Sequence, residues 1–187
     1  MQTRFHGLTF VTDPGYVFTP RTTTERLVDA ALARAGGGAT RIADVGTGSG
    51  AIAIAIALRA PAVDVWASDT CARALEVASL NAARLGAQVH LVKGDLLDGL
   101  PRNLDLVVAN LPYLAPGAPG YEGEPPAAVF SSGDGLDHYR RLIDAAADHL
   151  APAGAVIVQF DGEVFEAERR ELPGLRARLE ALAATAA

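Results

Sequence analysis

The stretch DVGTGSG, residues 44–50, decides the fold that this sequence specifies, because it places three glycines directly after an apolar run. Glycine adopts backbone conformations that other residues avoid, and the free N–H groups at the start of a helix face whatever lies above them. We therefore predict a strand, a tight turn and a helix, with a ligand bound at the turn, as in open α/β sheets. Three glycines would also suit a purely structural turn.

The stretch AIAIAIAL, residues 51–58, follows the glycines and alternates with a period of two, which is the pattern of a strand. Alanine is nevertheless the best helix former, and the glycine turn needs a helix start behind it. We therefore predict a helix over residues 49–59, with Ile52 and Ile56 on one face and Ile54 buried on the other.

Strands and helices alternate along the rest of the chain. The predicted strands are 41–45, 62–67, 89–92, 104–109 and 155–160, and the predicted helices between them include 49–59, 70–85 and 136–150. This alternation predicts an α/β fold with a parallel sheet in the strand order 3-2-1-4-5 and helices on both faces.

The chain is predicted to be one domain of 187 residues, with an N-terminal hairpin (1–21), a core (22–160) and a helical tail (161–187). The hairpin would pair 8–11 with 16–18 around a turn at 13–15. The tail would break at Pro173-Gly174, and either it or a second copy of the chain would cover the exposed sheet edge.

Composition excludes some classes of function. The net charge is −6, which argues against an open basic surface for nucleic acid. Cys71 is the only cysteine, so the chain cannot form an internal disulfide, and a reducing compartment is expected. Apolar runs are too short to span a membrane. We expect a cytoplasmic protein, and no cluster of His, Cys or acidic residues suggests a metal.

Two carboxylates follow the second and third predicted strands. Asp69 could accept hydrogen bonds from both hydroxyls of a ribose, or it could cap the next helix, a role that Thr70 could also fill. Asp95 could meet an adenine amino group or simply belong to a turn. Because the glycine spacing lacks the last glycine of a dinucleotide fingerprint, the favoured ligand is a nucleoside with an amino-acid tail, such as S-adenosylmethionine (AdoMet).

The fourth predicted strand ends in Asn110-Leu111-Pro112-Tyr113, across the crevice from the glycine turn. The asparagine oxygen and a nearby backbone carbonyl can accept both hydrogens of an NH2 group, and proline restricts the backbone before it. Tyr113 offers a flat face to a planar group. These residues suit an amide or an adenine, although a turn without chemistry would also fit. The Gly- and Pro-rich segment 113–135 is predicted to be a long functional loop.

The sequence resembles the class I AdoMet-dependent methyltransferases of the HemK/PrmC type, which methylate protein glutamine. The resemblance covers residues 4 to 160. It rests on RFHGLTFVTDPGYVFTPRTTTERLVDAAL, DVGTGSGAIAIAIA, ASDTCARALEVASLNAARLG, VKGDLLDGL, LDLVVANLPYLAP and EPPAAVFSSGDGLDHYRRLI. It implies a Rossmann-like sheet, AdoMet as cofactor, no metal, and direct methyl transfer to the amide nitrogen of a glutamine in a protein substrate.

The resemblance also implies roles for individual residues. The implied cofactor-binding residues are Asp44, Gly46, Thr47, Gly48, Gly50, Asp69, Thr70, Asp95, Leu96 and Asn110. The implied substrate-binding residues are Arg21, Asn110, Leu111, Pro112 and Tyr113, and the catalytic ones among them are Asn110, Pro112 and Tyr113.

This chain departs from the family pattern at three points. Leu111 stands where the family usually has a proline, and Asn-Leu-Pro-Tyr also occurs in adenine methyltransferases of ribosomal RNA. Full-length members carry an N-terminal helical domain before the region matched here. The family sheet ends in a sixth and a seventh strand, whereas residues after Phe160 are predicted to be helical. The alternatives are methylation of a small molecule or of adenine in nucleic acid, and an inactive AdoMet-binding module.

Overall fold

The computed structural model describes residues 1–114, 121 and 123–186. Its strands are β1 (Gln2–Phe5), β2 (Leu8–Val11), β3 (Arg41–Val45), β4 (Asp64–Asp69), β5 (His90–Lys93), β6 (Leu104–Ala109), β7 (Leu150–Phe160) and β8 (Glu163–Glu168). Its helices are η1 (Thr22–Thr24), α1 (Glu25–Gly36), α2 (Ala51–Arg59), α3 (Ala72–Leu85), α4 (Pro126–Val129), α5 (Asp137–His149), η2 (Arg169–Glu171) and α6 (Leu172–Ala186).

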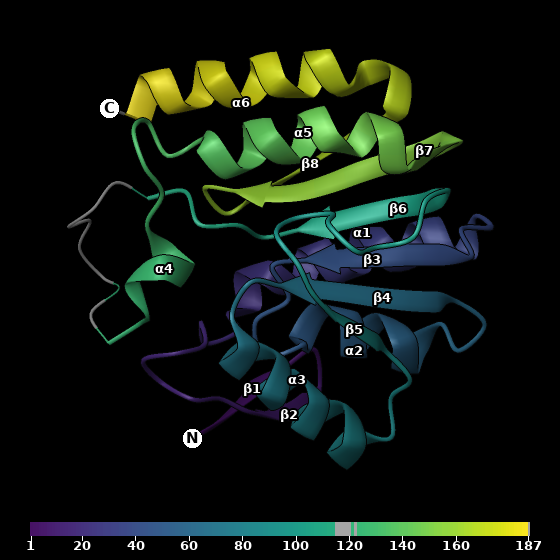
Figure 1. Cartoon of the computed structure of the whole chain (residues 1–187), viewed down its shortest axis with the longest axis vertical. Coiled ribbons are helices and arrows are strands. Elements are labelled where there is room, and N and C mark those ends of the chain that lie inside the picture. Colours follow the sequence, from purple (N-terminus) through teal and green to yellow (C-terminus); the bar gives the residue numbers. More distant parts are fainter. Residues whose placement is uncertain (115–120, 122, 187) are drawn as a thin grey trace.

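The central sheet has the order β5-β4-β3-β6-β7-β8, and its first five strands are parallel (Figure 1). One hydrophobic core lies between the sheet and the helices α1, α2 and α3, and a second lies between the sheet and α5 and α6. The predicted parallel α/β fold, with five strands in the order 3-2-1-4-5, is therefore confirmed.

The prediction of helix directly after Phe160 is wrong, because β8 forms there and pairs antiparallel with β7. Asp161 and Gly162 have φ values of 49° and 76°, as the two central residues of a tight hairpin turn require. Phe165 and Ala167 are buried while exposed Glu166 stands between them, so the alternation typical of a strand is present within this charged sequence. β8 covers the edge of β7, which was predicted to be covered by the helical tail or by a second copy of the chain. This edge therefore gives no argument for an oligomer.

The predicted break at Pro173-Gly174 is also wrong, because α6 begins at Leu172 and continues through both residues. Proline is tolerated in the first turn of a helix, where its missing N–H would have no partner within the helix.

The N-terminal hairpin exists, but its partner strand and its turn were predicted wrongly. β2 pairs with β1, not with residues 16–18. The turn is His6-Gly7, whose φ values are 49° and 77°. Residues after Pro14 leave the hairpin instead and approach the glycine turn. Val17 is buried, and its Cγ1 lies 3.7 Å from the position that a Cβ on Gly48 would take.

The helix predicted from an alternating sequence is confirmed as α2. Residues 51–56 are all buried, because α2 packs against the sheet, α1 and α3. A helix enclosed in this way needs apolar residues on every side, and this explains why the helical period of 3.6 is hidden. Within the described residues, no helix is long and apolar enough to cross a bilayer.

Candidate functional site

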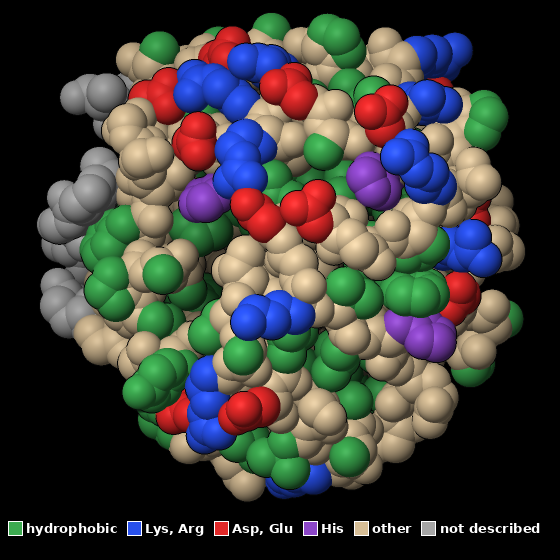
Figure 2. Space-filling view, in the orientation of Figure 1, with side chains coloured by type: hydrophobic (Ala, Val, Ile, Leu, Met, Phe, Trp, Pro, Cys, Tyr) green, Lys and Arg blue, Asp and Glu red, His purple; other side chains and the backbone are tan. Residues whose placement is uncertain are grey.

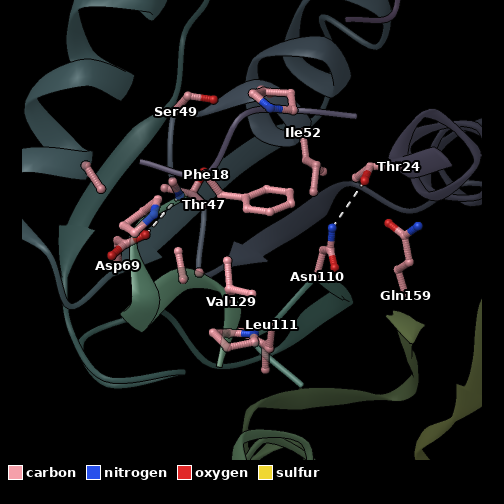
Figure 3. Close-up of a pocket in the computed structure, with 18 of the residues that line it drawn as sticks. Phe18, Thr24, Thr47, Ser49, Ile52, Asp69, Asn110, Leu111, Val129 and Gln159 are labelled. Carbon is pink, nitrogen blue, oxygen red and sulfur yellow. Dashed lines mark hydrogen bonds between the residues drawn. The ribbon is translucent and has the colours of Figure 1, made fainter. Parts of the chain in front are cut away.

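A cavity of about 910 Å³ opens at the carboxyl ends of the parallel strands. Its lining comes from the glycine turn, the ends of β4 and β6, residues 15–24 before α1, and the segments around α4 and the β7–β8 turn (Figure 3). The topological rule for open α/β sheets places a ligand at this crevice.

Four residues stand in one row across this edge of the sheet. Val45 pairs with Ser68 on one side and with Ala109 on the other, and Ala109 pairs with Val158. The next residue along each strand therefore stands at one level, which gives the row Asp69, Gly46, Asn110 and Gln159. Because residues in register point to the same face of a parallel sheet, the three side chains of this row share one face.

Gly46 and Gly48 shape the turn at the cavity floor, with φ values of 73° and 55°. A Cβ on Gly46 would lie 2.8 Å from Leu111 Cδ2, so any side chain there would also displace the Leu111 side chain. Gly50 does not line the cavity. A Cβ on it would meet Ile54 at 2.9 Å and Ala78 at 3.0 Å, so this glycine allows α2 and α3 to pack closely.

Asp44 lies beneath the turn and is fully buried, so it does not face the cavity. Its Oδ2 accepts hydrogen bonds from the Thr47 hydroxyl at 2.6 Å and from the Ala53 N–H at 3.2 Å, while its Oδ1 has no partner among the described residues. Burial raises the pKa of this carboxyl to about 7. Asp44 therefore holds the turn from below.

Asp69 makes the contact with the start of the next helix that the sequence left open as one of its two roles, and it also contacts the glycine turn. Its Oδ1 accepts a hydrogen bond from the Cys71 N–H at 2.8 Å, which satisfies the start of α3. Its Oδ2 accepts one from the Gly48 N–H at 2.9 Å, which fixes the glycine turn. Each carboxylate oxygen keeps a free lone pair, and the residue lines the cavity together with exposed Thr70.

Asp95 and Leu96 also line the cavity, at the end of β5. Asp95 forms an ion pair with Arg141 at 2.5 Å, so its carboxylate already has a cationic partner. Leu96 has a φ of 52°, and its carbonyl oxygen accepts a hydrogen bond from the Ser68 hydroxyl at 2.6 Å.

Asn110 extends from the end of β6 toward Thr24, whose hydroxyl accepts a hydrogen bond from Asn110 Nδ2 at 3.2 Å (Figure 3). This bond holds the nitrogen end of the side-chain amide and leaves Oδ1 as the end that can accept from a ligand. Thr24 is 5% exposed and precedes α1, and nothing in the sequence pattern marked it as part of the site.

Leu111 is buried, and its backbone is fixed by Tyr139 of α5. The Tyr139 hydroxyl accepts a hydrogen bond from the Leu111 N–H at 3.2 Å. The same hydroxyl lies 2.6 Å from the Gln159 carbonyl oxygen and 3.0 Å from the Leu111 carbonyl oxygen, to which it can donate. One buried hydroxyl thus joins the ends of β6 and β7.

Tyr113 is half-buried, and its ring packs against Phe160 with centroids 4.9 Å apart. Burial raises the pKa of this phenol to about 12, with a further contribution from the neighbouring Tyr121. Pro112 lines the cavity beside it. The predicted loop 113–135 lies partly outside the described residues, and its described part contains the short helix α4.

Arg21 lines the cavity with its guanidinium 4.3 Å from the ring centroid of Tyr121 and 5.2 Å from that of Phe18. The Thr19 N–H donates a hydrogen bond to Glu124 at 3.0 Å. These contacts join the segment before α1 to the segment around α4.

Gln159 is the cavity residue that sequence reasoning missed most clearly. It ends the fifth parallel strand at the level at which Asn110 ends the fourth. Gln159 is a polar residue within the otherwise apolar run 155–160, and this is the feature of the sequence that could have identified it. Asn81 was also missed: its side chain bonds Val11 and Ser49, which connects α3 to the hairpin and to the glycine turn.

The sequence of this chain is similar to those of known methyltransferases. Residues 7–121 match the family model described as the methyltransferase small domain. The chain is 42% identical to the release factor glutamine methyltransferase of Bordetella pertussis, over 86% of this chain and 63% of that protein. It is 37% identical to the release factor glutamine methyltransferase of Deinococcus radiodurans, over 81% of this chain and 56% of that protein. The chain thus spans about three fifths of the length of these relatives.

A solved structure shares the fold. The 16S rRNA N2 G1207 methyltransferase of T. thermophilus, in complex with AdoMet and guanosine, superposes with a TM-score of 0.64. The two chains are 21% identical, over 84% of this chain and 40% of that one. This likeness shows that the two proteins share a Rossmann-like fold.

Proposed function

This chain belongs to the methyltransferase small domain family, and from that premise we propose that it transfers a methyl group from AdoMet to the amide nitrogen of a protein glutamine. The observation that carries the proposal is the row at the sheet edge, where Asp69 and Asn110 flank the side-chain-free Gly46 within one cavity. The relatives that match over most of the chain are named as release factor glutamine methyltransferases.

The residues present fit AdoMet. The cavity volume lies within the range of small-molecule sites. Gly46 and Gly48 would admit the methionine part close to the backbone, because neither carries a Cβ. The free lone pairs of Asp69 would accept the ribose hydroxyls, and Asp95 with Leu96 would border the adenine. Asp44 and Gly50 would act indirectly, by holding the turn and the helix behind it.

An amide nitrogen is a poor nucleophile, because its lone pair is delocalised. When bound, AdoMet supplies a methyl group on a sulfonium that leaves as a neutral thioether. Asn110 Oδ1 would accept a hydrogen bond from the acceptor N–H and orient the nitrogen toward that methyl group, and Tyr113 would pack on the amide plane. Such alignment and polarisation can supply several kcal/mol. Neutral Asn110 cannot take up the released proton, so the proton leaves to water.

A release factor is the proposed substrate, by analogy with the relatives' names. Nucleic acid is a weaker candidate. The net charge is −6, and Figure 2 shows basic and acidic side chains interspersed on this face, without a continuous basic surface. Arg21 and the Asn110–Tyr113 segment would contact the glutamine-bearing loop.

The test pairs a binding measurement with a transfer measurement. Calorimetry should show AdoMet binding, and tritiated AdoMet should label a purified bacterial release factor. Asn110→Ala should keep the AdoMet Kd within a few fold and lose most turnover. Undetectable binding at millimolar AdoMet would refute the cofactor, and label that enters RNA or a small molecule instead would refute the acceptor.

A further inference from the structure

We propose that Asn81 is a positioning residue for the cofactor, although it does not line the cavity. Its buried side chain links the N-terminal hairpin to the glycine turn, and this link holds residues 12–18 at the distance from the turn that AdoMet binding requires. The inference rests on the proposed function and adds to it the residue that joins two walls of the cofactor site.

The side chain of Asn81 is enclosed and its amide is paired at both ends. Asn81 lies in α3 and is 0% exposed. Its Oδ1 accepts a hydrogen bond from the Val11 N–H at 2.8 Å, and its Nδ2 donates to the carbonyl oxygens of Val11 and Ser49, each at 2.9 Å. Because both amide hydrogens and the amide oxygen have partners, the orientation of the side chain is fixed.

The hydrogen-bond pattern of the hairpin directs Val11 toward α3. Thr12 exchanges both backbone hydrogen bonds with Met1, so the backbone groups of the preceding residue point away from β1. The Asn81 amide bonds both of these groups of Val11, as a neighbouring strand would. In Figure 1 the hairpin lies beside α3. One side chain thus takes the place of a partner strand at this point of β2.

Both ends of this link lead directly to the cavity. Ser49 belongs to the glycine turn and lines the cavity. The segment 12–18 follows Val11 and supplies another part of the lining. Its cavity-lining members are Gly15, Tyr16 and Phe18. Val17 Cγ1 lies 3.7 Å from the position that a Cβ on Gly48 would take, so the segment and the turn are in close contact.

A second polar contact also holds the segment 12–18 to α3. Asp13 and Arg73 form an ion pair at 2.7 Å, and both side chains are partly exposed. Ion pairs at the surface contribute little to stability. This pair joins only the segment and α3, whereas Asn81 also bonds the glycine turn. Arg73 therefore offers a matched control for Asn81.

Loss of the Asn81 amide would leave both backbone groups of Val11 and the Ser49 carbonyl without this partner, and the segment could then move relative to the turn. A site that is correctly assembled only part of the time has a Kd raised by the inverse of that fraction. Asn110 and its partner Thr24 are held by β6 and α1 instead. The expected signature is therefore a higher AdoMet Kd with an unchanged kcat.

The experiment compares Asn81→Ala and Arg73→Ala with the unmodified chain. Calorimetry gives the AdoMet Kd, tritiated AdoMet with a purified bacterial release factor gives kcat at saturating AdoMet, and amide hydrogen exchange reports on residues 12–18. In Asn81→Ala we expect the Kd to rise about tenfold, kcat to stay within about twofold, and exchange in residues 12–18 to become faster. Arg73→Ala should change the Kd less than about threefold.

Val11→Pro breaks the same link from the hairpin side and decides the question if Asn81→Ala does not fold. Proline lacks the N–H that Asn81 accepts, and because this N–H points away from β1, the bonds within the hairpin remain. The AdoMet Kd should rise about threefold or more in this variant.

An AdoMet Kd that stays unchanged in the folded variants would overturn the role of Asn81, and so would a fall in kcat at an unchanged Kd. Absence of AdoMet binding by the unmodified chain would overturn the proposed function together with this inference. A release factor that receives no label from the unmodified chain, despite AdoMet binding, would overturn only the proposed acceptor, because the Kd comparison still decides the role of Asn81.

Discussion

At the scale of single residues, Asp44 couples the glycine turn to pH. Burial raises the pKa of its carboxyl from 3.8 to about 7, so the folded protein keeps a proton that the unfolded chain releases. The stabilisation from this proton is fully present below pH 4 and is lost as the pH rises through 7. Between these limits the free energy of unfolding should fall by about 1 kcal/mol per pH unit from this residue.

Asp44→Asn should remove the pH-dependent part of the free energy of unfolding that comes from Asp44, because an amide does not titrate. The variant should still fold, because the amide oxygen can accept the hydrogen bonds from Thr47 and Ala53. Urea unfolding at pH 5 and pH 8 measures the free energy of unfolding. Between these two pH values, the variant should lose less stability than the unmodified chain. Exposed Asp148→Asn is the matched control and should behave like the unmodified chain. An equal loss in Asp44→Asn and in the unmodified chain would contradict the prediction.

At the scale of elements, α5 fixes the ends of β6 and β7 through the Tyr139 hydroxyl. Tyr139→Phe leaves the Leu111 N–H and the Gln159 carbonyl without this partner, and should lower the free energy of unfolding by about 1–3 kcal/mol. Turnover should fall while the AdoMet Kd stays within a few fold, because the glycine turn is untouched. Unchanged turnover in Tyr139→Phe would argue against the anchor.

The helices and strands also differ in how well the sequence alone predicts them. The five parallel strands and α2 were predictable, because apolar runs and glycine turns mark them locally. β8 was not, because its glutamates resemble a helical tail and its pairing depends on β7. Asn110 was predictable from its place after a strand. Thr24 was not, because its contact with Asn110 spans 86 positions of the chain and no local pattern encodes it.

At the scale of the whole molecule, two distant segments meet at the cavity. The Thr19 N–H bonds Glu124, and Arg21 packs on Tyr121, so residues before α1 contact residues near α4. A ligand that binds only the folded state stabilises it by about 3 kcal/mol at 100 times its Kd. AdoMet should therefore raise the melting temperature and slow amide hydrogen exchange in residues 16–24 and 46–50.

Methionine alone is the control ligand, because it lacks the nucleoside that Asp69 and Asp95 would hold. It should give a smaller rise in melting temperature at the same concentration. Exchange that slows only on the far side of the sheet, around η2 and α6, would place the ligand elsewhere.

The row at the sheet edge divides the site into two halves at Gly46, which alone contributes no side chain to it. In the proposed reaction, Asp69 would serve the methyl-donor half and Asn110 the acceptor half, so the transferred carbon would pass over backbone without a side chain. In that arrangement, substitutions at the end of β6 would change the nucleophile that is accepted, whereas the methyl donor would stay the same. Such a separation would allow one fold to act on different acceptors without changes in its cofactor-binding residues.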